Sequence, residues 1–262
     1  MQRGHESDSR GGEGDRFVVI SMGWGVQSFT LAAMSALGTL PPVDGAVFID
    51  TGWESELTYQ FIERWEGWLG ERGVKVERVV VDFANPVETQ WQRIAIPAHI
   101  RREDGAKGML PRQCTRTWKV EPTRRWLQKR RRRKPVDLWM GITANEASRA
   151  KASRTKYIRH VYPFLTMFDP PMRRVDAIHW LEEHGLEVPP RSSCVFCPLK
   201  SRGDWLEMKR RGGQDWRTAV HVDWTIRYAS DRFTAYLSRD MVPLEMLVSP
   251  EDQGQLTLWE EV

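Results

Sequence analysis

The chain has 262 residues, of which 40% are hydrophobic and 28% charged, and its mean hydropathy of −0.53 is that of a globular protein with enough mass for one large core. No apolar run approaches the ~18 residues that indicate a membrane span, so we expect no membrane association. The 39 Lys and Arg against 35 Asp and Glu leave a net charge of +4, which does not by itself require a polyanionic partner.

The N-terminal stretch Met1–Asp15 is polar and rich in glycine, which predicts a disordered tail over residues 1–15. It has the features of neither a secretory signal nor a transit peptide. The three cysteines, an odd number, do not suit a disulfide framework and fit a reducing compartment. We therefore predict a cytoplasmic protein.

The stretch Ser21–Ser28 lies between the apolar run Phe17–Ile20, which predicts a strand, and Phe29–Leu37, which predicts a helix. Glycines let backbone N–H groups approach an anion closely, and the start of a helix adds unpaired donors and a positive dipole end. The spacing matches neither G-x-x-x-x-G-K-[ST] nor G-x-G-x-x-G. The residues alone leave two interpretations open: a plain strand-to-helix connection, or a phosphate-binding loop formed by Ser21, Gly23, Gly25, Val26, Gln27 and Ser28.

Strand and helix signals alternate along the next part of the chain. This alternation predicts an α/β fold with a doubly wound, mostly parallel sheet, in which ligands bind beyond the carboxyl ends of the strands. Those ends would bring together Ser21–Ser28, Asp50–Gly52 and Gly141–Arg149. The further predicted strands are Gly45–Ile49, Val74–Val81 and Val136–Ile142, and the predicted helices are Glu56–Arg72, Trp118–Arg132 and Val175–His184.

The C-terminal part of the chain contains no motif that we can identify. A helix is predicted to start near Ser201, and the segments beyond Gly213 predict one or two more. No repeat or low-complexity linker divides the chain. We predict one domain over residues 16–205 and a C-terminal helical extension over residues 206–262 that packs on the same domain.

Five motifs, taken together and in order, resemble those of phosphoadenosine phosphosulfate (PAPS) reductase-like proteins, which belong to the PP-loop or adenine nucleotide alpha hydrolase-like superfamily. The similarity spans about residues 17 to 205, and five ordered motifs are far more specific than any one of them. The G-V-Q-S form of the loop resembles a branch found in phage and bacterial proteins. The motifs are Ser21–Ser28, Asp50-Thr51-Gly52, Cys114–Pro122, Gly141-Ile142 followed by Glu146 and Arg149, and Cys194-x-x-Cys197-Pro198.

The resemblance implies that the domain over residues 16–205 binds an adenine nucleotide, ATP with Mg²⁺, with the phosphates on the Ser21–Ser28 loop. It places Asp50, Thr51 and Gly52 near the adenosine and adds Gly141 to the nucleotide-binding set. It also implies that Glu146 and Arg149 lie near the phosphates or the substrate. Lys119, with its neighbours Arg112 and Arg116, is either part of the active site, where it would hold an anionic substrate, or surface charge.

The loop departs from the commoner S-G-G-x-D-S form of the family. Trp24 is bulky, and Gln27 stands where the family has an acid. Gln27 can donate a hydrogen bond to phosphate but cannot serve as a carboxylate. The resemblance therefore supplies no metal or sugar contact at this position.

Cys194 and Cys197 have the C-x-x-C spacing that can present two thiolates to one metal or cluster. Cys114 stands in a motif that supplies further cluster ligands in some relatives, although those relatives have a Cys-Cys pair where this chain has Gln113-Cys114. By this resemblance we predict that the three cysteines hold a [4Fe–4S] cluster with one open iron. The alternatives are a zinc ion completed by His99 or His160, and thiols that bind no metal.

The densest run of charge, Lys129–Lys134, follows the predicted helix that carries Lys119. A basic run at a helix C-terminus is favourable for the helix dipole and is commonly a solvated end. The functional alternative is contact with a nucleic-acid acceptor, tRNA or DNA, through Arg130, Arg131, Arg132 and Arg133. A homodimer is a further expectation, and the sequence does not specify a sulfur donor.

Two enzymatic hypotheses compete with one that is not catalytic. We favour an ATP-dependent sulfurtransferase-like enzyme that adenylates an oxygen of its substrate, after which sulfur displaces AMP. The second hypothesis is sulfonucleotide reduction, in which a thiolate attacks the sulfur of PAPS or adenylyl sulfate. In the reductases that this chain resembles, that thiolate comes from a C-terminal tail, and here no cysteine follows Cys197. The third is a nucleotide-binding module without turnover.

Overall fold

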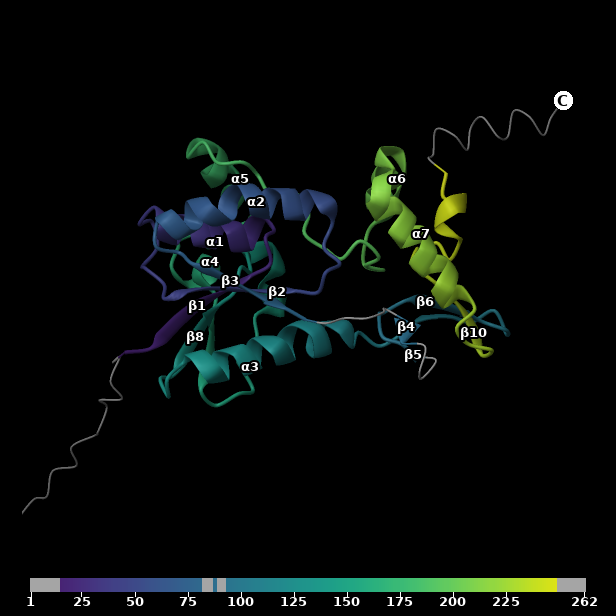
Figure 1. Ribbon diagram of the computed structural model, residues 1–262, viewed down its shortest axis with the longest axis horizontal. Coiled ribbons are helices and arrows are strands. Elements are labelled where there is room, and N and C mark those ends of the chain that lie inside the picture. Colours follow the sequence, from purple (N-terminus) through teal and green to yellow (C-terminus); the bar gives the residue numbers. More distant parts are fainter. Residues whose placement is uncertain (1–14, 82–86, 89–92, 249–262) are drawn as a thin grey trace, which may run out of the picture.

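A five-stranded parallel sheet forms the centre of the N-terminal part of the chain (Figure 1). The computed structural model describes residues 15–81, 87–88 and 93–248, so the disorder predicted for residues 1–15 falls outside them except at Asp15. The strand order is β3-β2-β1-β8-β9, which confirms the predicted α/β fold with a parallel sheet. The strands are β1 (Phe17–Met22), β2 (Gly45–Asp50), β3 (Val76–Val80), β8 (Val136–Trp139) and β9 (Ile158–Val161).

The chain order reverses direction at β1, because β2 and β3 lie on one side of it and β8 and β9 on the other. Such a reversal leaves a crevice beyond the carboxyl ends of the two central strands, where α/β proteins bind their ligands. This is the edge at which the loop after β1 and the residues after β8 meet. The topology therefore fixes where a site can form before any side chain is considered.

The sequence of β1, Phe-Val-Val-Ile-Ser-Met, is apolar on both faces because the sheet is covered on both sides. Ile20 and Met22 belong to the core cluster under α1 (Val26–Ala36), α2 (Glu56–Glu71) and α5 (Arg174–Glu183), whereas Val19 faces the cluster under α3 (Glu121–Arg130). Figure 1 shows α1, α2 and α5 on one side of the sheet and α3 on the other. A short helix, α4 (Pro163–Thr166), follows β9.

Three of the differences from the predicted element boundaries lie close to the strand ends or to Lys119. Helix α1 starts at Val26, not Phe29, so its first turn includes the end of the glycine loop. The helix predicted over Trp118–Arg132 opens as a π-helix, Arg116–Val120, before α3 runs to Arg130. Strand β8 ends at Trp139, three residues before the predicted end. The other predicted strands and helices of the sheet domain differ from the observed bounds by one or two residues.

A second core lies beside the sheet domain, at the right of Figure 1. It is built on the antiparallel sheet β10-β6-β7 and a two-stranded ribbon, and it takes apolar residues from both sides of the predicted boundary at residue 205. That boundary therefore falls inside the cluster. These strands are only two to four residues long, too short for a periodicity signal. The elements are β4 (Val87–Glu88), β5 (Arg93–Ile94), β6 (His99–Arg102), β7 (Lys107–Met109), α6 (Arg202–Arg211), α7 (Gly213–Arg227), β10 (Phe233–Tyr236) and a 3-10 turn at Leu244–Met246.

Within the described ranges, none of the helices combines the length and the apolar character that crossing a lipid bilayer requires.

Candidate functional site

A cavity of about 360 Å³ opens at the carboxyl ends of β1, β2 and β8. We call it the first cavity. The loop after β1, the start of α1 and the segment after β8 form its walls, with Lys119 and Ser192 added from elsewhere in the chain. The predicted site residues that line it are Ser21, Gly23, Gly25, Gln27, Ser28, Lys119, Gly141, Glu146 and Arg149.

Trp24 turns away from this cavity into the core. Its backbone is left-handed, with φ of 56°, and its side chain is fully buried. The indole contacts the rings of Phe29, Phe48 and Phe61 at centroid distances of 6.3–6.5 Å. This bulky residue therefore anchors the loop to the core and leaves the glycines of the loop facing the cavity.

Ser28 holds the loop in a closed shape. Its Oγ accepts a hydrogen bond from the N–H of Gly23 at 3.1 Å and donates to the carbonyl oxygen of Gly25 at 3.3 Å. Among the residues that the structure describes, no side chain caps the N-terminus of α1, and the first turn of this helix contains no acidic residue. The first N–H groups of the helix have no partner within the helix, and the positive end of its dipole lies at the cavity wall.

Gly141 allows the segment after β8 to pass directly against the start of α1. A Cβ at this position would lie 2.8 Å from the carbonyl carbon and 2.9 Å from the Cβ of Gln27, and 2.9 Å from the amide nitrogen of Ser28. These distances are too short for real atoms, and two of the neighbours belong to the backbone. Glycine is therefore required here for close approach and not for an unusual φ.

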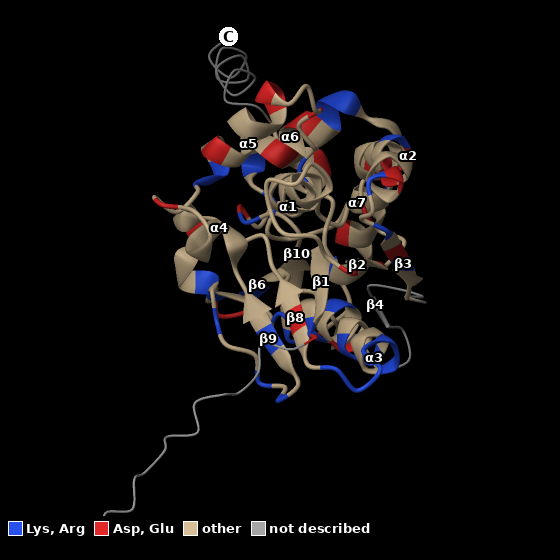
Figure 2. Cartoon of the chain, turned by 90° about the vertical axis from the view of Figure 1, so that its left-hand side faces the viewer, with Lys and Arg blue, Asp and Glu red and all other residues tan. Residues whose placement is uncertain are grey.

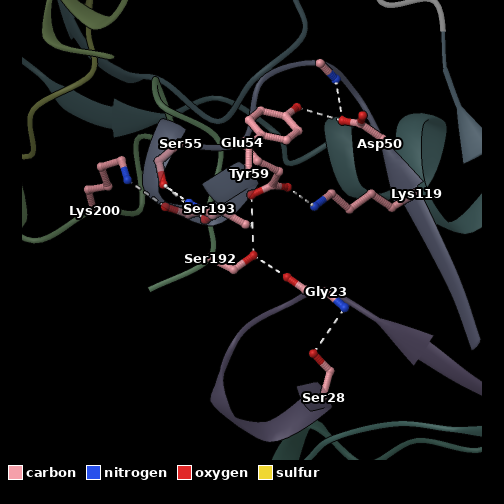
Figure 3. A network of polar contacts seen from close by, with 12 residues as sticks. Gly23, Ser28, Asp50, Glu54, Ser55, Tyr59, Lys119, Ser192, Ser193 and Lys200 are labelled. Atoms are coloured by element: carbon pink, nitrogen blue, oxygen red, sulfur yellow. Dashed lines mark hydrogen bonds and ion pairs between the residues drawn. The ribbon is translucent and has the colours of Figure 1, made fainter. Parts of the chain in front are cut away.

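A buried carboxylate that the sequence did not reveal, Glu54, organises one wall of the cavity (Figure 3). Its side chain is fully buried, and Oε1 accepts a hydrogen bond from Nζ of Lys119 at 2.9 Å. Burial disfavours the charged form of Lys119, but Glu54 and the neighbouring thiols outweigh it and raise the pKa of the ammonium group. Ser192 donates to the carbonyl oxygen of Gly23 and lies 3.4 Å from Oε2 of Glu54.

Glu146 and Arg149 face each other across the turn after β8. Arg149 forms an ion pair with Glu146 Oε1, and Gln27 donates to Oε2 at 3.3 Å. Gln27 thus binds an acid supplied by another segment. Both Glu146 and Arg149 also line a second cavity, described below.

Asp50 does not line the cavity, and neither do Thr51 and Gly52. Asp50 is buried and accepts hydrogen bonds from the N–H of Gly52 and the hydroxyl of Tyr59, both at 2.8 Å, and from Arg78 Nε at 2.7 Å. Burial acts to raise the pKa of Asp50, and these donors together outweigh it and lower the pKa. Val47 and Ile49, further back on β2, line the cavity instead.

The C-x-x-C segment is tied to the end of β2. Glu54 and Cys194 form a backbone bridge, and the N–H of Val195 donates to the carbonyl oxygen of Trp53 at 2.8 Å. Burial and the charge of Glu54 raise the pKa of the Cys194 thiol to about 12. Cys197 lines the second cavity.

The residues do not assemble the predicted metal centre. Over residues 15–81, 87–88 and 93–248, no three His, Cys, Asp or Glu side chains are arranged to hold a metal ion. Cys114 packs against the second core. Nε2 of His99 lies 3.2 Å from the carbonyl oxygen of Pro198, and Nδ1 of His160 lies 2.9 Å from that of Lys151. We therefore derive no chemical step through a cluster or a zinc ion, and both stay predictions.

The basic run lies at the opposite edge of the sheet. Figure 2 shows Lys and Arg in blue on α3 and on the segment that follows it. A separate cavity of about 400 Å³ lies at the amino ends of the strands and is lined by Arg130, Arg131 and Arg132. Phe17, Gly45 and Lys75 line it as well. Arg130 forms an ion pair with Glu77, and Lys134 pairs with Asp15 at 2.6 Å. Contact of this run, including Arg133, with a nucleic acid stays a prediction.

Several residues that line the two cavities were missed. Ser192 and Ser193 directly precede Cys194, and Lys200 follows Cys197 closely, so proximity to the C-x-x-C motif was the signal available for them. Val26 lines the second cavity and not the first. The sequence pattern could not identify Glu54 as a site residue, because acidic residues near the start of a helix are common. The remaining lining residues that were not predicted are Met22, Val47, Ile49, Thr123, Met140, Ile142, Arg174, Pro190, Arg191 and Leu199.

Comparisons with known proteins give one kind of match. No family model and no curated protein matches the chain. Among solved structures, the fold is similar to the crystal structure of phosphoadenylyl-sulfate (PAPS) reductase from Candida auris in a phosphate complex, with a TM-score of 0.45 and 12% identity over 67% of this chain and 76% of the other. The chemistry of the site is therefore interpreted from its own residues.

The contact at Gly141 leads to a prediction about stability. Gly141→Ala should destabilise the protein by about 1–3 kcal/mol, because the methyl group must displace the first turn of α1. Gly67→Ala is the control, since it lies in α2 with no atom within 4 Å of a new Cβ and should be neutral or stabilising by up to about 1 kcal/mol. Urea unfolding measures both. Equal effects of the two substitutions would contradict the close approach.

The environment of Asp50 predicts a pH dependence. The lowered pKa means that the stability supplied by the carboxylate is complete above its unfolded-state pKa of about 3.9 and is lost as pH falls through the folded-state value. Asp50→Asn should therefore be less stable than the wild type by about 1–3 kcal/mol at pH 7, and the difference should shrink below pH ~4. Denaturant unfolding across pH 3–7 tests this, with the exposed Asp231→Asn as control. A constant difference across that range would exclude a role for the charge.

Proposed function

We propose that the first cavity binds ATP, with the phosphates against the N-terminus of α1 and the loop Ser21–Ser28. The observation that carries this proposal is the combination, in one cavity, of an uncapped helix N-terminus with the cations Lys119 and Arg149. Helix N-termini and fixed cations are the groups that stabilise phosphate oxygens in proteins. The glycines at 23 and 25 leave the backbone free to contact them.

Apolar side chains supply the rest of the cavity. Val47, Ile49, Met140 and Ile142 line it beside the polar loop. Nucleotide sites combine such an apolar wall with a few well-placed polar groups, the wall taking the base and ribose. Because β1 and β8 are the strands on either side of the switch point, the phosphates and the nucleoside would both lie beyond the same edge of the sheet.

The reaction that we propose is adenylation of an acceptor followed by sulfur transfer. A hydroxyl or carbonyl oxygen of the acceptor attacks the α-phosphorus of ATP, and pyrophosphate leaves. Lys119 and the N–H groups of α1 stabilise the negative charge that builds up on the phosphate oxygens. A sulfur nucleophile at the oxidation level of sulfide then displaces AMP from the activated carbon. Glu146 lines both cavities and is therefore the group in position to accept a proton from a hydroxyl acceptor.

Mg²⁺ would reach this site with the triphosphate. Among the described residues that line the first cavity, Glu146 supplies the carboxylate. Carboxylate oxygens are hard ligands of the kind that Mg²⁺ accepts beside phosphate oxygens. The ion would neutralise phosphate charge. Asp50 is committed to Arg78 and Tyr59 and does not compete for it.

Cys197 supports a second candidate function, sulfonucleotide reduction. Its side chain lines the second cavity, which shares Gln27, Glu146, Arg149 and Ser192 with the first. The sequence predicts that all three cysteines hold a cluster, whereas in the structure Cys197 lines a cavity. In this reaction the thiolate attacks the sulfur of the bound nucleotide, the nucleotide leaves, and an external dithiol releases sulfite while it is oxidised to a disulfide.

Nucleotide binding is tested by changing the loop. Ser28→Ala combined with Gly25→Val should weaken ATP binding at least about 10-fold, a loss of ~1.4 kcal/mol, because it removes the hydroxyl that closes the loop and places a branched side chain over the start of α1. Isothermal titration calorimetry gives the affinity, and circular dichroism verifies the fold. Gly67→Val in α2 is the control. Unchanged affinity in a folded double variant would exclude the first cavity as the nucleotide site.

The products distinguish the two reactions. With ATP labelled at the α-phosphate we expect slow formation of AMP and pyrophosphate, with water as the acceptor, and no ADP. Lys119→Met should lower this rate about 10²-fold, the typical effect of losing one fixed donor to developing charge, whereas the exposed Lys156→Met should not. Release of sulfite from PAPS in the presence of dithiothreitol, abolished by Cys197→Ser, would instead establish the reductase.

A further inference from the structure

A second cavity of about 600 Å³ adjoins the first, between the start of α1 and the segment around the C-x-x-C motif. The two cavities share five lining residues, so a ligand in one cavity lies next to a ligand in the other. The shared residues are Gly25, Gln27, Glu146, Arg149 and Ser192. The second cavity is strongly cationic. Five cations and one carboxylate line it: Arg112, Arg149, Arg174, Arg191, Lys200 and Glu146.

Two of the five cations already have a carboxylate partner. Arg149 pairs with Glu146, and Arg191 pairs with Asp204. The other three have no ion pair with a carboxylate in the part of the chain that the structure describes. Nε of Arg112 donates to the hydroxyl of Thr115 at 2.8 Å, and Nζ of Lys200 donates to Oγ of Ser193 at 2.6 Å. Both partners are neutral, so charge is left over for a ligand.

The burial of Lys200 is the most informative of these observations. The residue is only 8% exposed, and lysine is almost never buried without a paired charge. The Lys200–Ser193 contact of Figure 3 holds the amine at the cavity wall. A buried cation with spare N–H donors becomes satisfied when an anion occupies the cavity.

We infer that the second cavity binds the oxyanion group of a second, small substrate, through Lys200, Arg112 and Arg174. The inference rests on the proposed function in one respect, that the neighbouring cavity holds the nucleotide. A phosphate, sulfate or carboxylate group fits these donors equally, because each offers the oxygens that guanidinium and ammonium groups bind.

The shape of the site favours a small molecule over a nucleic acid. The volume lies within the ~300–1,000 Å³ of small-molecule pockets, and the cations surround one cavity instead of following an extended surface. Because the two cavities share a wall, an acceptor held by its anionic group in the second cavity would present its other end to the phosphates in the first. Glu146 lies at the boundary between the two.

Calorimetric titration with inorganic phosphate, and separately with sulfate, tests the subsite in the full chain. We expect the wild type to bind both anions, Lys200→Met to weaken binding at least about 10-fold, and Arg174→Gln to weaken it more than about 3-fold. Lys156→Met and Arg125→Gln, both exposed, are the matched controls and should have no effect. Since Lys200 is buried, thermal unfolding is used to show that Lys200→Met folds, and the exposed Arg174 provides an independent variant.

The single variant Ser28→Ala separates this proposal from the nucleotide site, because Ser28 lines the first cavity and not the second. We expect it to bind ATP more weakly but to keep Lys200-dependent phosphate binding. If wild-type protein fails to bind ATP and still binds phosphate through Lys200, the proposed function fails and the subsite stands. Phosphate binding that is lost in Ser28→Ala and unchanged in Lys200→Met would overturn the subsite, as would anion binding confined to a tRNA or DNA oligonucleotide.

Discussion

The buried charge of Glu54 is the constraint on which the geometry of both cavities depends. A carboxylate removed from water must be paired, and Glu54 is paired with Lys119 and lies next to Ser192. Its backbone also bridges to Cys194. Three segments that are distant in sequence are thereby held at the carboxyl end of β2. Loss of Lys119 would leave the buried carboxylate of Glu54 without its cation, so the cation that faces the first cavity is also part of the structure that shapes it.

The two cavities and the basic run divide the positive charge of the protein into separate sites. Lys119 lies just before α3 and the basic run at its end, and α3 has ten residues, which corresponds to about 15 Å of helix. A ligand that touched both would have to extend along the whole helix. The cations of the second cavity, in contrast, share a wall with the first. Small substrates are therefore expected at the carboxyl edge of the sheet, and any polyanion at the amino edge would bind independently of them.

The sequence predicted four of the five strands of the parallel sheet, missing β9, and it predicted none of the strands of the second core. Continuous apolar runs such as Phe17–Ile20 identify buried parallel strands, and α1 and α2 follow from their spacing of apolar residues. The strands of the second core contain two to four residues, and no periodic signal exists at that length. Their pairing joins His99–Arg102 to Phe233–Tyr236, a contact between segments so distant in the chain that propensity could not indicate it.

Among the predicted site residues, those on the loop other than Val26 and those after β8 line the first cavity, because backbone topology brings the strand ends together. Asp50 also lies at a strand end but does not line this cavity. Its position at a strand end is as predicted, but its side chain is satisfied by Tyr59 and Arg78, partners that no motif specifies. The sequence identifies Trp24 only as a bulky loop residue, and its left-handed backbone turns the side chain into the core.

The sequence by itself determined the α/β class, the loop between β1 and α1, and the need for glycine around that loop, because these follow from local periodicity and from the motif order. Only the tertiary structure decided which polar and charged side chains contact one another. It brought Lys119 to Glu54, Gln27 to Glu146 and Lys200 to Ser193, and it placed Cys197 in a cavity. The physical reason is that a buried ion or donor acquires its partner from whichever segment the fold packs beside it, and that choice is set by the packing of the whole chain.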